Sequence, residues 1–289
     1  MNRLAMLEKL RERQRHWDIV VIGGGATGAG IAVDAASRGY SVALLEKSDF
    51  GKATSSRSTK LVHGGVRYLQ QANFSLVREA LHERTILRRN APHLVKPLPF
   101  VLPSYRWGGE TYYGLGLWLY DRLAGRHGFG RSRRLGRDET LTRLPSLKTS
   151  REQTLRGGVL YYDGQLYDAR LLINLIQTAS EQVALTVNYA PVTRLLKSAT
   201  GKVTGVVAVD ALAEEEFTLQ ARAVINATGA FSDEIRRLDD AESRPIIAPS
   251  QGVHIVLNRS FLPTDSALII PRTRDGRVLF AIPWHVILL

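Results

Sequence analysis

The chain has 289 residues, is 44% hydrophobic and carries a formal net charge of +12 at pH 7. That composition can bury a core and excludes a disordered protein, while the absence of cysteine excludes disulfides, cysteine-ligated metals and a thiol nucleophile, and no metal is expected. The charge indicates an anionic partner such as a phosphorylated substrate or an acidic membrane surface; no nucleic acid is expected, because no nucleic-acid-binding motif accompanies the arginines.

The N-terminal residues 2–16 alternate leucines with basic residues, a spacing typical of a short amphipathic helix. The favoured interpretation packs this helix on the protein through Leu4, Leu7 and Leu10, and the alternative rests it on an acidic bilayer. No stretch approaches the roughly 18 apolar residues of a membrane-spanning helix, and no secretory signal is evident. We therefore expect a cytoplasmic protein, with a peripheral position on the inner face of the cytoplasmic membrane as the alternative.

A strand is predicted at 18–22, followed by a glycine turn, a helix through Ala36 and a second strand at 42–45. The turn fits G-x-G-x-x-G, in which glycines allow a tight turn and close approach of a pyrophosphate to the helix N-terminus. Glu46 follows the second strand, where a carboxylate can accept hydrogen bonds from both hydroxyls of an adenosine ribose. These residues predict a dinucleotide site without separating FAD from a nicotinamide cofactor.

The next segment, 54–65, is rich in Ser, Thr and Gly and is predicted to be a loop. Its hydroxyls and glycines suit a flavin tail and ring edge, although a plain polar surface loop has the same composition. Helices are predicted at 74–89 and 112–123, the second within an otherwise irregular stretch from 92 to 136.

The later part of the chain returns to regular alternation. A helix is predicted at 168–182, and strands follow at 185–187, 191–197, 203–210, 216–219 and 223–226. The last strand ends in INATG, a small-residue turn that lets the backbone approach phosphate or ribose.

Three stretches together, DIVVIGGGATGAGIAVDAASRG from Asp18, ATSSRSTKLVHGGVRYL from Ala53 and INATGAFSDEI from Ile225, resemble the FAD-dependent glycerol-3-phosphate dehydrogenases of the D-amino-acid-oxidase-like superfamily. The resemblance implies an α/β fold with a Rossmann-like FAD-binding domain interleaved with an incomplete substrate (cap) domain. The expected parts are a basic segment 1–16, FAD-binding segments 17–90 and 156–240, an insertion 91–155, and the start of the substrate domain at 241–289.

The resemblance also assigns roles to individual residues. The cofactor-binding set is Gly23, Gly24, Gly25, Thr27, Gly28 and Glu46 for the adenosine diphosphate, Val192 for adenine, Thr54, Ser55, Ser56, His63, Gly64 and Gly65 for the flavin side, and Ala227, Thr228 and Gly229 for the pyrophosphate region.

The implied reaction is oxidation of glycerol 3-phosphate to dihydroxyacetone phosphate, with electrons passed to a membrane quinone. Arg67 would meet the substrate phosphate and Tyr68 would orient a substrate oxygen, against the alternative of a solvated arginine and a packed tyrosine. His254, on a strand predicted from QGVHIV, is the candidate proton acceptor, against a purely structural histidine.

Members of this family are considerably longer, and their remaining substrate arginines and second flavin-contacting segment lie beyond Leu289. We therefore expect a truncated or frameshifted product. The alternatives are a non-catalytic FAD-binding fragment and a related flavin oxidase of an amine or hydroxy acid, which would pass electrons to dioxygen.

Overall fold

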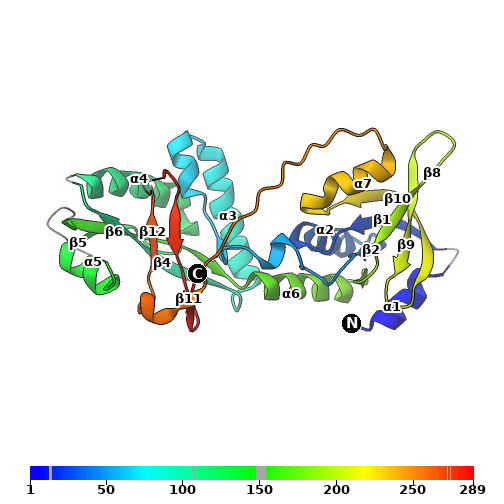
Figure 1. The fold of residues 1–289 in the computed structure, drawn as a ribbon, viewed down its shortest axis with the longest axis horizontal. Helices are drawn as coiled ribbons and strands as arrows, with labels where there is room; N and C mark the ends of the chain where they lie inside the picture. Colours follow the sequence, from blue (N-terminus) through cyan, green and yellow to red (C-terminus); the bar gives the residue numbers. More distant parts are fainter. Residues whose placement is uncertain (13–14, 107, 148–153, 272, 274) are drawn as a thin grey trace. The chain divides into compact units, whose positions relative to one another are not determined.

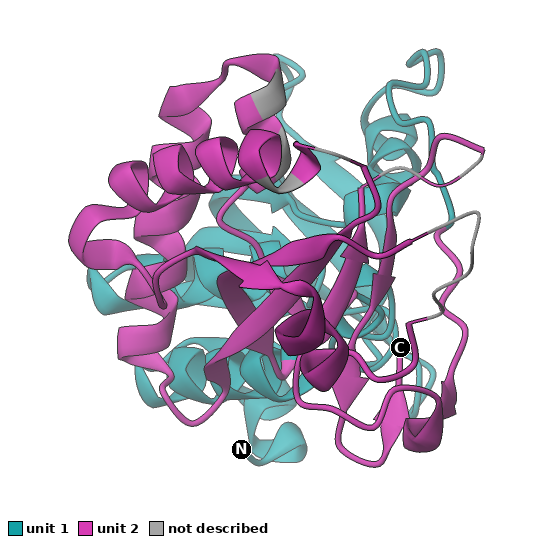
Figure 2. Ribbon diagram, turned by 90° about the vertical axis from the view of Figure 1, so that its left-hand side faces the viewer, with its two compact units in different colours: residues 1–58, 168–251 teal, residues 59–167, 252–289 magenta. Residues whose placement is uncertain are grey.

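The computed structural model describes residues 1–12, 15–106, 108–147, 154–271, 273 and 275–289. The chain forms two compact units, unit 1 from residues 1–58 and 168–251 and unit 2 from residues 59–167 and 252–289 (Figures 1 and 2). The chain passes between them after residues 58, 167 and 251, whereas the expected domain boundaries follow residues 90, 155 and 240.

Unit 1 is a six-stranded sheet in the order β7-β2-β1-β10-β9-β8. Its strands are β1 (His16–Ile22), β2 (Val42–Leu45), β7 (Leu185–Val187), β8 (Val192–Lys197), β9 (Val203–Asp210) and β10 (Glu215–Asn226). Its helices are α1 (Arg3–Leu10), α2 (Ala26–Ser37), η1 (Thr54–Ser56), α6 (Asp168–Glu181), η4 (Gly229–Phe231) and α7 (Ser232–Asp239). Strands β7, β2, β1 and β10 run parallel, as in dinucleotide-binding folds.

The two strands predicted at 216–219 and 223–226 are one continuous strand, β10. Its first half pairs antiparallel with β9 and its second half pairs parallel with β1. Because the pairing partner changes midway along the strand, the sequence pattern predicts two separate strands. The other predicted elements of unit 1 are confirmed, except that the N-terminal helix ends at Leu10.

Both faces of the parallel sheet are covered, as the continuous apolar strands require. Side chains alternate along β1, so Val20 packs with α1 and the meander strands, whereas Val21 packs with α2 and α6. Small residues on α2, among them Ala29 and Ala32, are fully buried in that second cluster and let the helix lie close to the sheet.

The N-terminal helix α1 packs on the protein. Leu7 and Leu10 are 3% and 1% exposed in the core around Trp17, whereas Leu4 is 69% exposed. Arg3 donates to Asp210 at 2.6 Å, which ties the polar side of the helix to the end of β9. These contacts support the packed interpretation of this segment.

Unit 2 contains a sheet in the order β13-β12-β4-β6-β3 with β5 beside β6, and a small sheet in the order β11-β15-β14. The strands are β3 (Leu61–Val62), β4 (Val95–Ser104), β5 (Arg133–Gly136), β6 (Gly157–Leu166), β11 (Leu257–Asn258), β12 (Ala267–Ile270), β13 (Leu279–Ala281), β14 (Pro283–Trp284) and β15 (Ile287–Leu288). The helices are η2 (Val66–Gln71), α3 (Phe74–Asn90), α4 (Gly109–Ala124), η3 (Gly125–His127), α5 (Arg137–Arg143) and η5 (Arg259–Phe261). The predicted helices at 74–89 and 112–123 are confirmed as α3 and α4.

The stretch predicted to be irregular from 92 onward contains the ten-residue strand β4, and this part of the prediction is wrong. Pro97, Pro99 and Pro103 have the same parity along the strand, so their missing N–H groups fall on one side of it. The opposite side stays available to β6, which pairs with β4 along its whole length.

Candidate cofactor site

The glycine turn joins β1 to α2 with almost no space for side chains. Gly23 has φ +113°, and a Cβ on it would lie 2.6 Å from the carbonyl oxygen of Ala227. A Cβ on Gly28 would lie 1.9 Å from the carbonyl oxygen of Gly23, so the first turn of α2 rests directly on the turn. Gly25 is the N-cap of α2 and provides no side-chain cap, while Thr27 in the first turn is exposed. This leaves the helix N-terminus suited to an anionic group.

Glu46 lies at the end of β2 beside this turn. Its carboxylate accepts from the N–H of Gly24 at 2.7 Å and of Ser48 at 2.8 Å. A carboxylate offers about four acceptor positions, so two protein contacts leave capacity for ribose hydroxyls. The sequence therefore correctly placed a carboxylate next to the turn.

The INATG turn at the end of β10 lies against the glycine turn. The N–H of Ala227 donates to the carbonyl of Ile22 at 2.8 Å, immediately before the glycine turn. Thr228 donates through its hydroxyl to Asn226 at 2.7 Å, and Gly229 has φ +59°. Two turns built from small residues thus converge at the carboxyl ends of β1 and β10, where ligands bind in open α/β sheets.

Two further predicted residues of unit 1 lie near these turns. Ser55, in η1, accepts through its hydroxyl from the N–H of Ala26 at 2.9 Å, with Thr54 and Ser56 on either side of it. Val192 begins β8, two residues after Ala190, whose N–H donates to the carbonyl of Glu46 at 2.8 Å. The backbone near Val192 is therefore tied to that of Glu46.

The residues present fit a dinucleotide. A glycine turn with little space for side chains, a helix N-terminus without a side chain at its N-cap and an adjacent carboxylate meet the needs of a pyrophosphate and a ribose. In the described ranges, no group of three or more His, Asp or Glu side chains could hold a metal ion.

The other residues predicted for the flavin side, His63, Gly64 and Gly65, belong to unit 2. Gly65 adopts a left-handed conformation with φ +77° and caps η2. The His63 side chain is 43% exposed, and it lines a cavity of about 800 Å³ within unit 2 together with Tyr68 and Phe280. The cavity walls are mainly aromatic and aliphatic, and its size suits a small-molecule ligand.

The three residues proposed for catalysis are only partly brought together. Arg67 and Tyr68 both lie in η2, but the Arg67 side chain lies outside the described part of the structure. Tyr68 is 40% exposed at the wall of the cavity. His254 is exposed, and within the described residues no hydrogen bond or ring contact joins it to Tyr68.

The predicted strand around His254 is wrong. Residues 251–256 are not in a strand, and Val253, Ile255 and Val256 are 82%, 69% and 57% exposed. β-Branched residues favour strands mainly through packing on neighbours. No strand among the described residues pairs with this segment, so its composition alone does not produce one.

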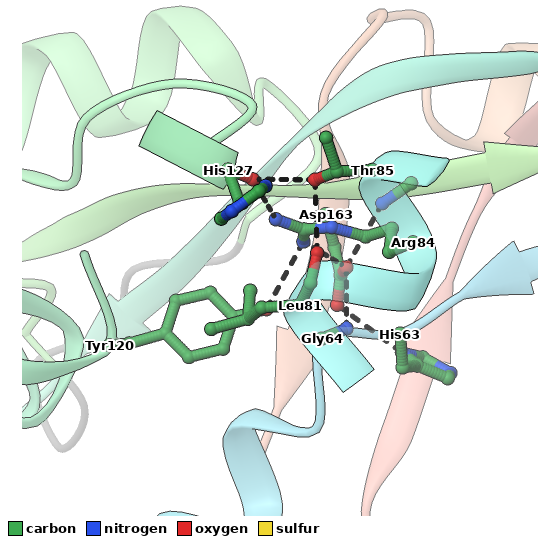
Figure 3. Close-up of polar contacts among 9 residues, drawn as sticks. His63, Gly64, Leu81, Arg84, Thr85, Tyr120, His127 and Asp163 are labelled. Atoms are coloured by element: carbon green, nitrogen blue, oxygen red, sulfur yellow. Dashed lines mark hydrogen bonds and ion pairs between the residues drawn. The ribbon is translucent and has the colours of Figure 1, made fainter. Parts of the chain in front are cut away.

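Sequence reasoning missed two buried charged residues behind the His63–Gly65 turn. Arg84 of α3 donates to Asp163 of β6 at 2.6 Å, and each side chain is 1% exposed (Figure 3). Asp163 also accepts from the N–H of Gly64 at 3.0 Å, and Tyr120 contacts Arg84 at 3.1 Å. Burial raises the pKa of the Tyr120 phenol far above its usual range, so its hydroxyl is neutral. No local sequence pattern indicates this cluster, because its residues lie far apart in the sequence.

Parallel strands, a glycine turn and an acidic residue at the end of the next strand are the features of a dinucleotide-binding fold. Residues 18–288 match the model of the FAD-dependent oxidoreductase family, and the chain belongs to that family. The expected α/β fold class is confirmed.

Curated relatives of the chain include glycerol-3-phosphate dehydrogenases. The mitochondrial glycerol-3-phosphate dehydrogenase of Rattus norvegicus is 47% identical over 281 residues, covering 93% of this chain and 38% of the relative. The mitochondrial enzyme SDP6 of Arabidopsis thaliana is 45% identical over 276 residues, covering 92% of this chain and 44% of the relative. The chain thus spans about two fifths of the length of these curated relatives.

Among solved structures, the glycerol-3-phosphate dehydrogenase of Bacillus halodurans complexed with FAD has a TM-score of 0.74 and 32% identity, covering 99% of this chain and 48% of that one. A glycine oxidase from Geobacillus kaustophilus shares the fold, with a TM-score of 0.66 and 18% identity. The resemblance drawn from the three sequence motifs is confirmed.

Proposed function

We propose that this chain binds FAD and takes part in the oxidation of glycerol 3-phosphate to dihydroxyacetone phosphate, with a membrane quinone as electron acceptor in glycerol catabolism. The observation that carries the proposal is the Gly23–Gly28 turn, which lies against Ala227 and beside Glu46. The identity to glycerol-3-phosphate dehydrogenases supports the choice of substrate.

In this proposal the adenosine diphosphate lies at the glycine turn and the N-terminus of α2. Backbone N–H groups and the helix dipole stabilise the pyrophosphate, and Glu46 accepts from the ribose. Thr54–Ser56, His63–Gly65 and Ala227–Gly229 keep the flavin-side and pyrophosphate roles that the resemblance gives them.

FAD, when bound, supplies the two-electron acceptor for carbon 2 of the substrate. The chain must bind a phosphate dianion, a task for the guanidinium of Arg67, and orient the reacting hydroxyl, a task for Tyr68. A base must remove the hydroxyl proton, and His254 keeps that role as a proposal. His254 is exposed and lies outside the helices and strands.

We propose a cytoplasmic location, with contact to an acidic membrane surface where the quinone is reduced. The net charge of +12 supports attraction to such a surface. No helix in the described part of the chain has the length and apolar composition needed to cross a membrane. Because Leu7 and Leu10 of α1 are buried, that helix is a poor candidate for the lipid contact.

Purification of the chain with FAD, followed by absorbance spectra before and after anaerobic glycerol 3-phosphate, tests the proposal. We expect bound flavin that is bleached by glycerol 3-phosphate and not by glycerol. Bound flavin that no substrate bleaches would reduce the function to cofactor binding. Bleaching by an amine or hydroxy acid with rapid reoxidation by dioxygen would instead support a flavin oxidase, and no bound flavin would refute the cofactor site.

The role of Arg67 is tested separately by Arg67→Ala. We expect the substrate concentration for half-bleaching to rise at least about tenfold, since a charged hydrogen bond contributes about 1.5–3 kcal/mol, while flavin binding is unchanged. Arg194→Ala removes an equal charge from an arginine that is 65% exposed on β8, and serves as the matched control. Equal effects of the two substitutions would refute a phosphate contact.

A further inference from the structure

Asp163 lies at the centre of a buried polar cluster behind the His63–Gly65 turn (Figure 3). One carboxylate oxygen, Oδ1, accepts from Arg84 at 2.6 Å and from the N–H groups of Gly64 and Gly164, each at 3.0 Å. The other, Oδ2, lies 3.4 Å from Nδ1 of His63. A single carboxylate thus contacts both the backbone and the side chain of the turn.

These contacts make Asp163 an acceptor toward each of its partners. Its carboxylate forms a buried ion pair with Arg84 at 2.6 Å and accepts from two backbone N–H groups. An ionised carboxylate only accepts hydrogen bonds. A hydrogen bond from Nδ1 of His63 to Oδ2, which lie 3.4 Å apart, requires the proton on Nδ1, and in a neutral ring Nε2 is then the acceptor.

The turn has little freedom to move away from Asp163. A Cβ on Gly64 would lie 1.9 Å from the Tyr120 hydroxyl and 2.5 Å from Cδ2 of Leu81. Arg84, which contacts Tyr120, also lies 4.1 Å from the ring centre of Phe129. The guanidinium is thereby held on several sides, and it holds the carboxylate in turn.

We infer that Asp163, held by Arg84, is a positioning residue that fixes the Gly64 backbone and selects the Nδ1–H form of the His63 ring on the wall of the cavity. These contacts position the turn before any ligand binds. Its consequence for flavin rests on the proposed function, in which His63–Gly65 lie on the flavin side.

The first test needs no variant and no cofactor. Nitrogen NMR of the FAD-free chain at a pH where the ring is neutral distinguishes a protonated from an unprotonated Nδ1, and the His63 signals are assigned by their loss in His63→Gln. We expect a protonated Nδ1 and an unprotonated Nε2. The reverse assignment would overturn the inference, whether or not the chain binds FAD.

The second test separates positioning from mere stability. Asp163→Asn alone leaves Arg84 buried without a counter-ion and is expected to impair folding. The double variant Arg84→Gln with Asp163→Asn removes both charges and keeps polar groups at both positions, with a shorter side chain at position 84. Asp121→Asn is the matched control, because Asp121 is a carboxylate of the same unit that accepts from Ser132.

We expect the double variant to fold and to lose the preference for Nδ1–H at His63. It should bind FAD about tenfold more weakly, because a displaced turn would lose about one hydrogen bond to the flavin. The Asp121→Asn control should keep both properties. A folded double variant with an unchanged His63 ring and FAD affinity within about twofold of wild type would show that the pair only stabilises the fold. Failure of wild-type chain to bind FAD would refute the proposed function, while the state of the His63 ring would still decide this inference.

Discussion

Substitution by alanine at two glycines of α2 is expected to change the stability of the chain in opposite directions. At Gly28 an added methyl group would lie 1.9 Å from the carbonyl oxygen of Gly23 and 3.3 Å from Cγ1 of Val21, so backbone must move. Such overpacking typically costs about 1–3 kcal/mol. At Gly30 nothing lies within 4 Å of the added group, and replacing glycine in a helix interior by alanine stabilises by about 0.5–1 kcal/mol.

Gly28→Ala and Gly30→Ala should therefore differ by about 1.5–4 kcal/mol in the free energy of unfolding. Urea unfolding followed by circular dichroism measures this difference, provided that the two variants unfold with the same m-value. Flavin titration should show weakened FAD binding only for Gly28→Ala, because only that methyl group displaces the glycine turn. If the two variants were equally stable, or if both bound FAD normally, the close contact between α2 and the turn would be refuted.

Leu10→Ala should destabilise the chain by about 2–5 kcal/mol in urea unfolding because Leu10 is 1% exposed, whereas Leu4→Ala should change it by less than about 0.5 kcal/mol; equal effects would contradict the packing of α1. The hydrogen bond from Arg3 lowers the pKa of Asp210, so the stability it contributes is present above the unfolded pKa of about 3.9 and is lost as pH falls through the lower folded pKa. Asp210→Asn should accordingly lower the unfolding midpoint at pH 7. The difference in midpoint between variant and wild type should shrink as the pH falls below about 4, and a difference independent of pH would refute this assignment. Glu46→Gln should raise the dissociation constant of FAD roughly 10- to 100-fold in a fluorescence titration, since a charged acceptor is lost, and an unchanged constant would remove Glu46 from the site.

The sequence predicted the elements of unit 1 because their signals are local. An apolar strand, a glycine turn and a helix with small residues at 3.6-residue spacing occupy fewer than thirty consecutive positions. Glu46 follows at the end of the next strand, so the adenosine half of the candidate site could be placed without knowing the tertiary structure. The prediction divided β10 into two strands because its first half pairs with β9 and its second half pairs with β1.

The sheet of unit 2 was missed for the opposite reason. β4 carries three prolines, which locally predict a loop, and it becomes a strand through its pairing with β6 more than fifty residues later. The same pairing brings Asp163 to Arg84, which is 79 residues away in the chain. No periodicity within either segment indicates that contact, whereas the strand predicted around His254 had the right composition and lacks a pairing strand among the described residues.

The two candidate regions should also respond differently to substitution. In unit 1 the glycine turn has little space for side chains. The destabilisation caused by each substitution there depends on how close the added atoms come to the neighbouring backbone. Behind His63 lies a buried charge pair, Arg84 and Asp163, and removing one member leaves the other buried and uncompensated. The effects of single substitutions at Arg84 and Asp163 should therefore be far from additive, and the double variant should be more stable than Asp163→Asn alone. That non-additivity is the reason why a loss of flavin binding in the single variant cannot by itself assign a positioning role, and why the state of the His63 ring is the decisive observation.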